Sequence, residues 1–150
     1  MRLRGRLFER GRPDEPEQAR QGKRGEEAAY RHLRKLGYTV VARNYRTRDG
    51  RGEVDLIGWD REQLAFVEVK TRGTGEFGSP ESAVDSSKRL NIIRAAAEYL
   101  RRAGIDWSCA RFDTVSVIGR ERFEIEVRKD AFTRRETLDS GALAGPGGRG

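Results

Sequence analysis

Residues 53–70 constrain the fold most, because their apolar and polar side chains alternate as in two adjacent β-strands. The segment 60–62 between them predicts a tight turn. With Arg61 and Glu62 as a two-residue loop, the antiparallel register places Asp55 directly opposite Glu68. A register two residues different places Asp55 opposite Phe66, still on the same face, whereas a shift of one residue separates the two acids.

The charged side chains of these two strands are predicted to share one face of the sheet. Alternation puts on that face Glu53, Asp55, Ile57, Phe66, Glu68 and Lys70, and on the opposite face Val54, Leu56, Ala65, Val67 and Val69. An ordinary solvated strand surface is the alternative interpretation. Apolar neighbours on both faces favour a buried central hairpin, where charges are costly unless they are paired or bind metal. The pattern therefore predicts a site for a hard divalent cation and an attacking water.

The composition excludes several other kinds of site. The single Cys109 excludes an intramolecular disulfide and a multi-cysteine metal site. His32, the only histidine, points away from the apolar stripe of its predicted helix, so zinc-hydrolase and serine-triad chemistry lack a usable imidazole. No apolar run has the length of a signal-peptide core or a membrane span, so we expect a cytoplasmic protein without a membrane partner.

The charge distribution favours a polyanionic partner without identifying one. The net charge is +7, and residues 1–24 hold eight Arg and Lys against four Asp and Glu. Nucleic-acid binding and simple solubility explain this excess equally well. We expect a disordered basic arm over residues 1–20, one folded domain over 21–132 and a disordered Gly-rich tail over 133–150.

The order of predicted elements is helix, three strands, helix and two strands. The helices cover 25–36 and, from 81 or 86, run to 102; the strands cover 39–45, the two halves of 53–70, 111–118 and 122–127. Gly37 and Gly104 are expected to end the helices, and the second helix is expected to bury Leu90, Ile93, Ala97 and Leu100. The segment 71–80 is predicted to be a long loop. This order indicates an α/β fold with a mixed sheet flanked by helices.

Glu26 and Glu27 are adjacent, and the helical period separates their roles. At ~100° per residue, Glu26 falls within the apolar stripe of Ala29 and Leu33. Glu27 falls in a solvated row with Arg31. Acidic residues are common in the first turn of a helix, but that preference does not explain the inward direction of Glu26.

The ordered set of motifs resembles the YraN-like family of the PD-(D/E)XK superfamily, near the Holliday-junction resolvases. The resemblance covers about residues 20–132 and rests on Gly22-x-x-x-Glu26-x-x-Ala29-x-x-x-Leu33, residues 52–57, Val67-Glu68-Val69-Lys70, Phe77-Gly78 and residues 111–113. It implies a restriction-endonuclease-like three-layer core around a mixed sheet. Val54 stands where the superfamily has proline, and the acids are retained.

The resemblance also implies the parts of a nuclease site. Asp55, Glu68 and Lys70 would be the catalytic core, and Glu26 the helix-borne acid of resolvase-like members. Mg²⁺ or Mn²⁺ would be held by Asp55, Glu68 and the Val69 main-chain carbonyl, with Glu26 completing the shell or orienting a water. Lys70 would position or help deprotonate the attacking water, and Glu53 is an accessory acid.

The implied activity is hydrolysis of phosphodiester bonds in nucleic acid, preferably structured or branched DNA rather than RNA. Candidate contacts to the nucleic-acid backbone are Arg72, Lys88 and Arg89, with Arg43, Arg46 and Arg48 as a second cluster. Two alternatives stay open: a binding protein that keeps the fold without turnover, and an RNA-processing nuclease. A homodimer is expected only by analogy with junction resolvases.

Overall fold

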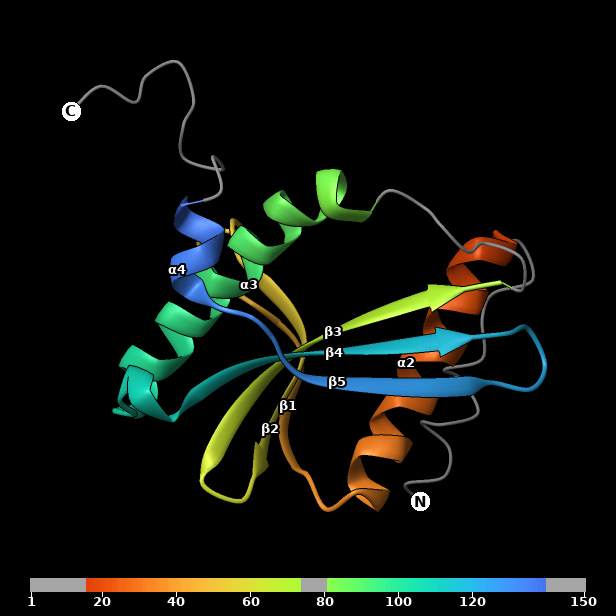
Figure 1. The fold of residues 1–150 in the computed structure, drawn as a ribbon, viewed down its shortest axis with the longest axis horizontal. Helices are drawn as coiled ribbons and strands as arrows, with labels where there is room; N and C mark the ends of the chain where they lie inside the picture. Colours follow the sequence, from red (N-terminus) through yellow and green to blue (C-terminus); the bar gives the residue numbers. More distant parts are fainter. Residues whose placement is uncertain (1–15, 74–80, 140–150) are drawn as a thin grey trace.

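The computed structural model describes residues 16–73 and 81–139, which form a mixed five-stranded sheet between helices (Figure 1). The elements are α2 (Glu17–Lys35), β1 (Thr39–Arg46), β2 (Glu53–Asp60), β3 (Gln63–Arg72), α3 (Glu81–Ala103), the 3₁₀ turn η1 (Trp107–Cys109), β4 (Ala110–Ile118), β5 (Glu124–Phe132) and α4 (Arg134–Thr137). The strand order is β1-β2-β3-β4-β5, with β3 and β4 parallel and the other neighbours antiparallel. The order of helices and strands and the mixed sheet agree with the sequence prediction.

Two apolar clusters fill the spaces between the sheet and its helices. On one side α2 packs with Ala29 and Leu33 against the sheet residues Leu56 and Val67. On the other side α3 packs against a cluster that includes Phe66. The molecule therefore has the α/β three-layer architecture of a restriction-endonuclease-like core.

Local backbone features confirm the predicted turns. Gly37 ends α2 with a φ of 101°, and its N–H donates to the Arg34 carbonyl at 3.0 Å. A residue with a side chain rarely adopts this left-handed conformation. Asp60 pairs with Gln63, so Arg61 and Glu62 form the predicted two-residue turn. The paired residues run from this turn to Leu56 opposite Val67, one position before Asp55 and Glu68.

Both predicted terminal segments contain helix. α2 begins at Glu17, eight residues before the predicted start at Gly25. Charged and polar residues dominate this first part of α2, so it shows no apolar period to reveal it. Similarly, α4 lies within the predicted tail, and Thr133 caps it by accepting a hydrogen bond from the Glu136 N–H. Residues 1–15 and 140–150 lie outside the described residues.

The predicted alternation along β2 is wrong at its first residues. Val54 belongs to the cluster under α3 together with Ile57, whereas Leu56 belongs to the cluster under α2. In the register with β1, the residue facing Asp55 is Asn44, whose φ is 50°. This left-handed residue twists the two strands locally, so residues three apart share a face here.

Three other predicted boundaries or faces also change. β3 extends through Arg72 into the predicted loop, whose residues 74–80 lie outside the described residues. β5 begins two residues later than predicted and extends five residues further, to Phe132. α3 buries Ile92, Ala95 and Ala96 beside the predicted Ile93 and Leu100, while the predicted Leu90 and Ala97 are only half-buried.

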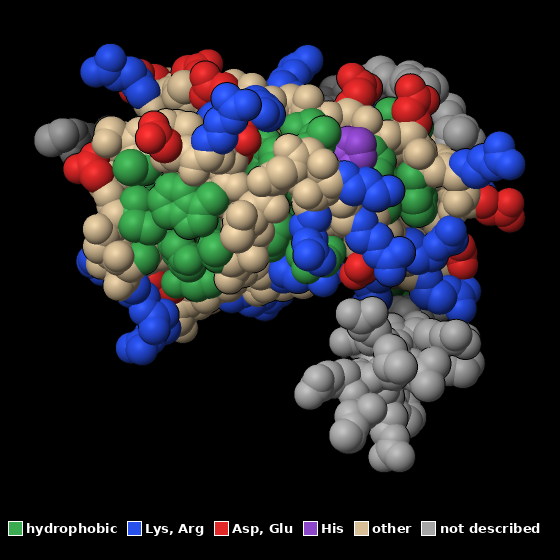
Figure 2. All heavy atoms as spheres, turned by 90° about the horizontal axis from the view of Figure 1, so that it is seen from below, with side chains coloured by type: hydrophobic (Ala, Val, Ile, Leu, Met, Phe, Trp, Pro, Cys, Tyr) green, Lys and Arg blue, Asp and Glu red, His purple; other side chains and the backbone are tan. Residues whose placement is uncertain are grey.

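The helices leave a strongly charged exterior. Figure 2 shows hydrophobic side chains gathered on one half of the visible face, and Lys and Arg side chains gathered around the histidine on the other half. The one histidine of the chain is His32 on α2. Of the helices in the described ranges, none combines the length and the apolar character needed to cross a bilayer.

Candidate active site

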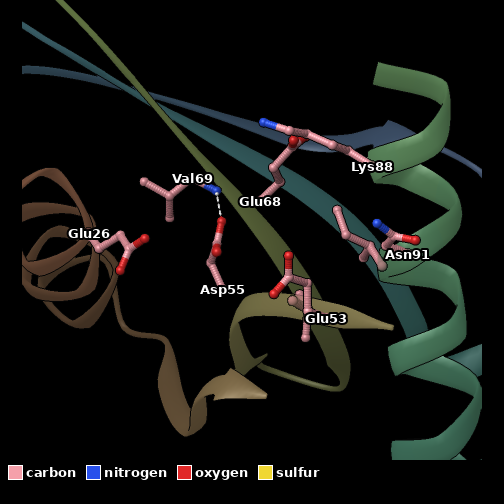
Figure 3. A pocket seen from close by; sticks show the side chains of 9 residues that line it. Glu26, Glu53, Asp55, Glu68, Val69, Lys88 and Asn91 are labelled. Carbon is pink, nitrogen blue, oxygen red and sulfur yellow. Dashed lines mark hydrogen bonds between the residues drawn. The ribbon is translucent and has the colours of Figure 1, made fainter. Parts of the chain in front are cut away.

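A cavity of about 210 Å³ opens where β2 begins and β3 ends, between the middle of α2 and the first half of α3. Acidic side chains from three elements line it (Figure 3). The lining residues are Glu26, Glu53, Val54, Asp55, Glu68, Val69, Lys88, Asn91 and Ile92. The structure thus brings together four of the acids that the sequence singled out.

The Asp55 carboxylate is held against the neighbouring strand. Strands β2 and β3 pair from Asp60 opposite Gln63 to Leu56 opposite Val67. Beyond these pairs, the Val69 N–H donates to Asp55 Oδ2 at 2.7 Å. The Asp55 side chain therefore accepts a hydrogen bond from a main-chain N–H of the adjacent strand β3. This bond fixes Asp55 beside Glu68, which is 5% exposed.

Glu26 reaches the cavity because α2 lies very close to β3. A Cβ atom on the preceding residue, Gly25, would lie 2.0 Å from Thr71 Cγ2, which no real contact allows. Figure 3 shows Glu26 directed from α2 toward Asp55. Glu27 instead accepts bonds from Arg31 and Arg43 on the outside of the helix, as the helical period predicts for the Arg31 pair.

Crowding of carboxylates shapes the electrostatics of the cavity. Burial raises the pKa of the Asp55 carboxyl, and the Glu53 carboxylate adds to the rise, while the Val69 N–H and the Lys88 ammonium oppose it. Burial is also the main cause of the raised pKa of Glu26, followed by the charge of Asp55. Such a cluster of acids gains stability from a bound cation.

The oxygen donors of the cavity fit a hard divalent cation. Asp55 and Glu68 lie side by side on adjacent strands, Val69 supplies a main-chain carbonyl, and Glu26 faces them from α2. Mg²⁺ is usually held by one or two carboxylates with several waters and phosphate oxygens, so few protein ligands suffice. Among the described side chains of residues 16–73 and 86–139, no three Asp, Glu, His or Cys residues are arranged to enclose an ion by themselves. The fit is therefore to an open, partly hydrated site.

Glu53 and Lys70 differ in their relation to the cavity. Glu53 lines it and also pairs with Arg46 at 3.2 Å, at the exposed rim. Lys70 follows Glu68 by two residues on β3, is half-buried, and pairs with Ser116 of β4 in the sheet register. It is not among the residues that line the cavity.

The predicted cationic residues are distributed over several surroundings. Lys88 lines the cavity from α3. Arg43 lies over the Tyr30 ring at 4.1 Å and pairs with Glu27 at 2.9 Å, and Arg89 lies over the Phe132 ring at 4.9 Å. The main chains of two others bond to other segments: the Arg48 N–H donates to Glu98, and the Arg72 carbonyl accepts from the Gly119 N–H. The structure therefore brings only Lys88 of the six to the cavity lining.

Asn91 lines the cavity but was not predicted. It lies on α3 one turn after Lys88, so the i, i+3 spacing from Lys88 was the available signal.

A second charged cluster lies at the opposite end of β2. There the Arg111 guanidinium donates to Asp113 and Asp60, each at 2.8 Å, and the fully buried Asp113 also accepts from the Tyr38 hydroxyl. Asp113 is therefore the buried acid of an ion-pair network with Arg111.

Comparison with known proteins decides the family. The model of the uncharacterised protein family UPF0102 matches residues 25–117. This chain belongs to that family. A UPF0102 protein of Solibacter usitatus is 56% identical over 111 residues, which cover 74% of this chain and 84% of the relative. A UPF0102 protein of Koribacter versatilis is 49% identical over 121 residues, which cover 80% of this chain and 84% of the relative.

UPF0102 is the YraN-like group of the PD-(D/E)XK superfamily, so the resemblance drawn from the motifs is confirmed. The matched segment begins at Gly25 in α2 and ends within β4. It therefore includes all of the acids that line the cavity.

Proposed function

We propose that this protein is a metal-dependent endonuclease that hydrolyses phosphodiester bonds, with structured or branched DNA as its preferred substrate. The observation that carries the proposal is the convergence of Glu26, Glu53, Asp55 and Glu68 on one cavity. Membership of a PD-(D/E)XK group supports the same chemistry, because carboxylates on adjacent strands are the common feature of those sites.

Asp55 and Glu68 would hold Mg²⁺ or Mn²⁺ together with the Val69 carbonyl, and Glu26 would complete the shell or orient a water. When bound, the ion lowers the pKa of water and neutralises charge that grows on the phosphate. Asp55 is kept in position by the Val69 N–H, and Lys88 places an ammonium on the α3 side of the cavity, where it can contact a phosphate oxygen. Lys70 is proposed to help deprotonate the attacking water after a side-chain movement toward the cavity.

A second candidate is a nucleic-acid-binding protein that keeps the fold without turnover. Two observations favour it: the described residues contain no enclosed three-ligand group, and Lys70 is absent from the cavity lining. Binding and cleavage of matched DNA and RNA versions of one branched structure would distinguish a DNA substrate from an RNA substrate.

Titration with Mn²⁺ by calorimetry tests the metal site itself. We expect wild type to bind Mn²⁺, and Asp55→Asn and Glu68→Gln each to weaken binding by at least about 100-fold, since removing a direct ligand costs more than removing an outer partner. Glu27→Gln, which changes the adjacent outward acid of α2, is the matched control and should bind as wild type does. Equal binding by all four proteins, or none by wild type, would exclude this metal site.

A further inference from the structure

The outward side of α2 carries a dense row of cations that neither the cavity nor the predicted contacts include. Opposite the buried residues Gly25, Ala29 and Leu33, the helical period places six basic side chains. We call them the α2 basic face: Arg20, Lys23, Arg24, Arg31, Arg34 and Lys35. The histidine in Figure 2 is His32 of this helix, and Lys and Arg side chains gather around it.

The acids on the same side of α2 do not neutralise this face. Glu17 pairs with Arg20, and Glu27 pairs with Arg31 and with Arg43 of β1. Both of these outward carboxylates are thus already paired with Arg side chains. The Arg31 side chain is 72% exposed even with its partner, so water and a further anion have access to it. Exposed pairs of this kind contribute at most about 1 kcal/mol to stability.

The α2 basic face and the cavity acid Glu26 lie on the same helix. The positive charges of Lys23 and Arg43 act on the Glu26 carboxyl, where they oppose the rise in pKa that burial causes. From Arg20 to Lys35 the helix extends about 22 Å at 1.5 Å per residue. Along the axis of B-DNA, that length spans about six phosphates of each strand, at 3.4 Å of axial rise per phosphate. One helix thus presents an acid to the cavity and a track of cations beside it.

We propose that the α2 basic face binds the sugar-phosphate backbone of the nucleic acid that flanks the scissile bond. This inference rests on the proposed function and extends it, since it assigns the surface that holds the substrate. The contacts would be to phosphate oxygens, so they would give affinity and salt dependence without base preference.

The test is the salt dependence of binding to a four-way DNA junction, without divalent metal, between about 50 and 200 mM salt. We expect Arg31→Gln/Arg34→Gln to weaken binding about tenfold at the lowest salt and to reduce the slope of log K against log salt by about 1.8, or 0.9 for each lost contact. The charge-preserving Arg31→Lys/Arg34→Lys should keep the slope. The matched control is Arg101→Gln/Arg135→Gln, which removes two exposed cations from α3 and α4 and should bind as wild type does.

An unchanged slope in Arg31→Gln/Arg34→Gln would overturn the inference, as would an equal loss in the control pair, which would indicate a net-charge effect. If these variants bind as wild type does while wild type still cleaves the junction with Mg²⁺, only the α2 surface is excluded. If wild type neither binds nor cleaves DNA or RNA, the proposed function fails together with the inference.

Discussion

At the scale of single residues, Asp55 and Asp113 are both acids within β-strands, but their surroundings differ. Asp113 accepts hydrogen bonds from the Arg111 guanidinium, the Tyr38 hydroxyl and the Asp130 N–H, at 2.8 to 3.0 Å. Asp55 accepts one from the Val69 N–H and otherwise faces the carboxylates of the cavity. Donors thus compensate the charge of Asp113, whereas Asp55 shares its cavity with three further acids and the Lys88 ammonium, and this is where we propose that a metal ion binds.

Replacing Asp113 should therefore damage stability. We expect Asp113→Ala to lower the free energy of unfolding by about 3 to 5 kcal/mol, because it removes one partner of a buried ion pair and leaves Arg111 and Tyr38 poorly satisfied. Urea denaturation followed by circular dichroism measures this change. Glu62→Gln, at an exposed residue of the nearby turn, is the control and should stay within about 0.5 kcal/mol of wild type. A similarly small effect of Asp113→Ala would show that the cluster has no structural role.

At the scale of elements, α2 carries different charges on its two sides and packs close to β3. Its inward side presents Glu26 to the cavity, and its outward side presents the basic face. Gly25 sets the distance, since any side chain there would collide with Thr71. Gly22 lies one turn earlier and has open space at its Cβ position.

The two glycines give a matched test of this distance. We expect Gly25→Ala to destabilise the protein by about 1 to 3 kcal/mol and to weaken Mn²⁺ binding, because overpacking moves α2 and Glu26 away from the sheet. Gly22→Ala should instead be neutral or stabilising by up to about 1 kcal/mol, from helix propensity alone. Thr71→Ala should restore part of the loss in the Gly25→Ala background. Denaturation and calorimetry on the same samples measure the stability and the Mn²⁺ affinity. Equal changes in Gly25→Ala and Gly22→Ala would contradict this account.

At the scale of the whole molecule, the sequence predicted most of the architecture because local patterns report it. Alternation and the turn at Arg61 and Glu62 gave the hairpin register, and the helical period distinguished Glu26 from Glu27. These patterns depend only on residues that are close in the chain, so the sequence alone was sufficient to predict the hairpin and the direction of Glu26.

The features that the sequence did not predict depend on tertiary contacts. The start of α2 at Glu17 has no apolar period, and the twist at Asn44 moves Val54 to the other face of β2. The pairing of Arg43 with Glu27 and its contact with the Tyr30 ring join two elements, as does the position of Asn91 in the cavity. Such contacts are fixed only once the sheet and helices pack together.

Cleavage of a four-way DNA junction tests the central claim most directly. With Mg²⁺ or Mn²⁺ we expect wild type and Glu27→Gln to cut the junction, and Asp55→Asn to be at least about 100-fold slower, since it loses several kcal/mol of transition-state stabilisation. Chelation of the metal should abolish cutting by every variant. Equal cutting by Asp55→Asn and wild type, or no cutting of any branched, flapped or single-stranded substrate, would contradict a metal-dependent nuclease centred on Asp55 and Glu68.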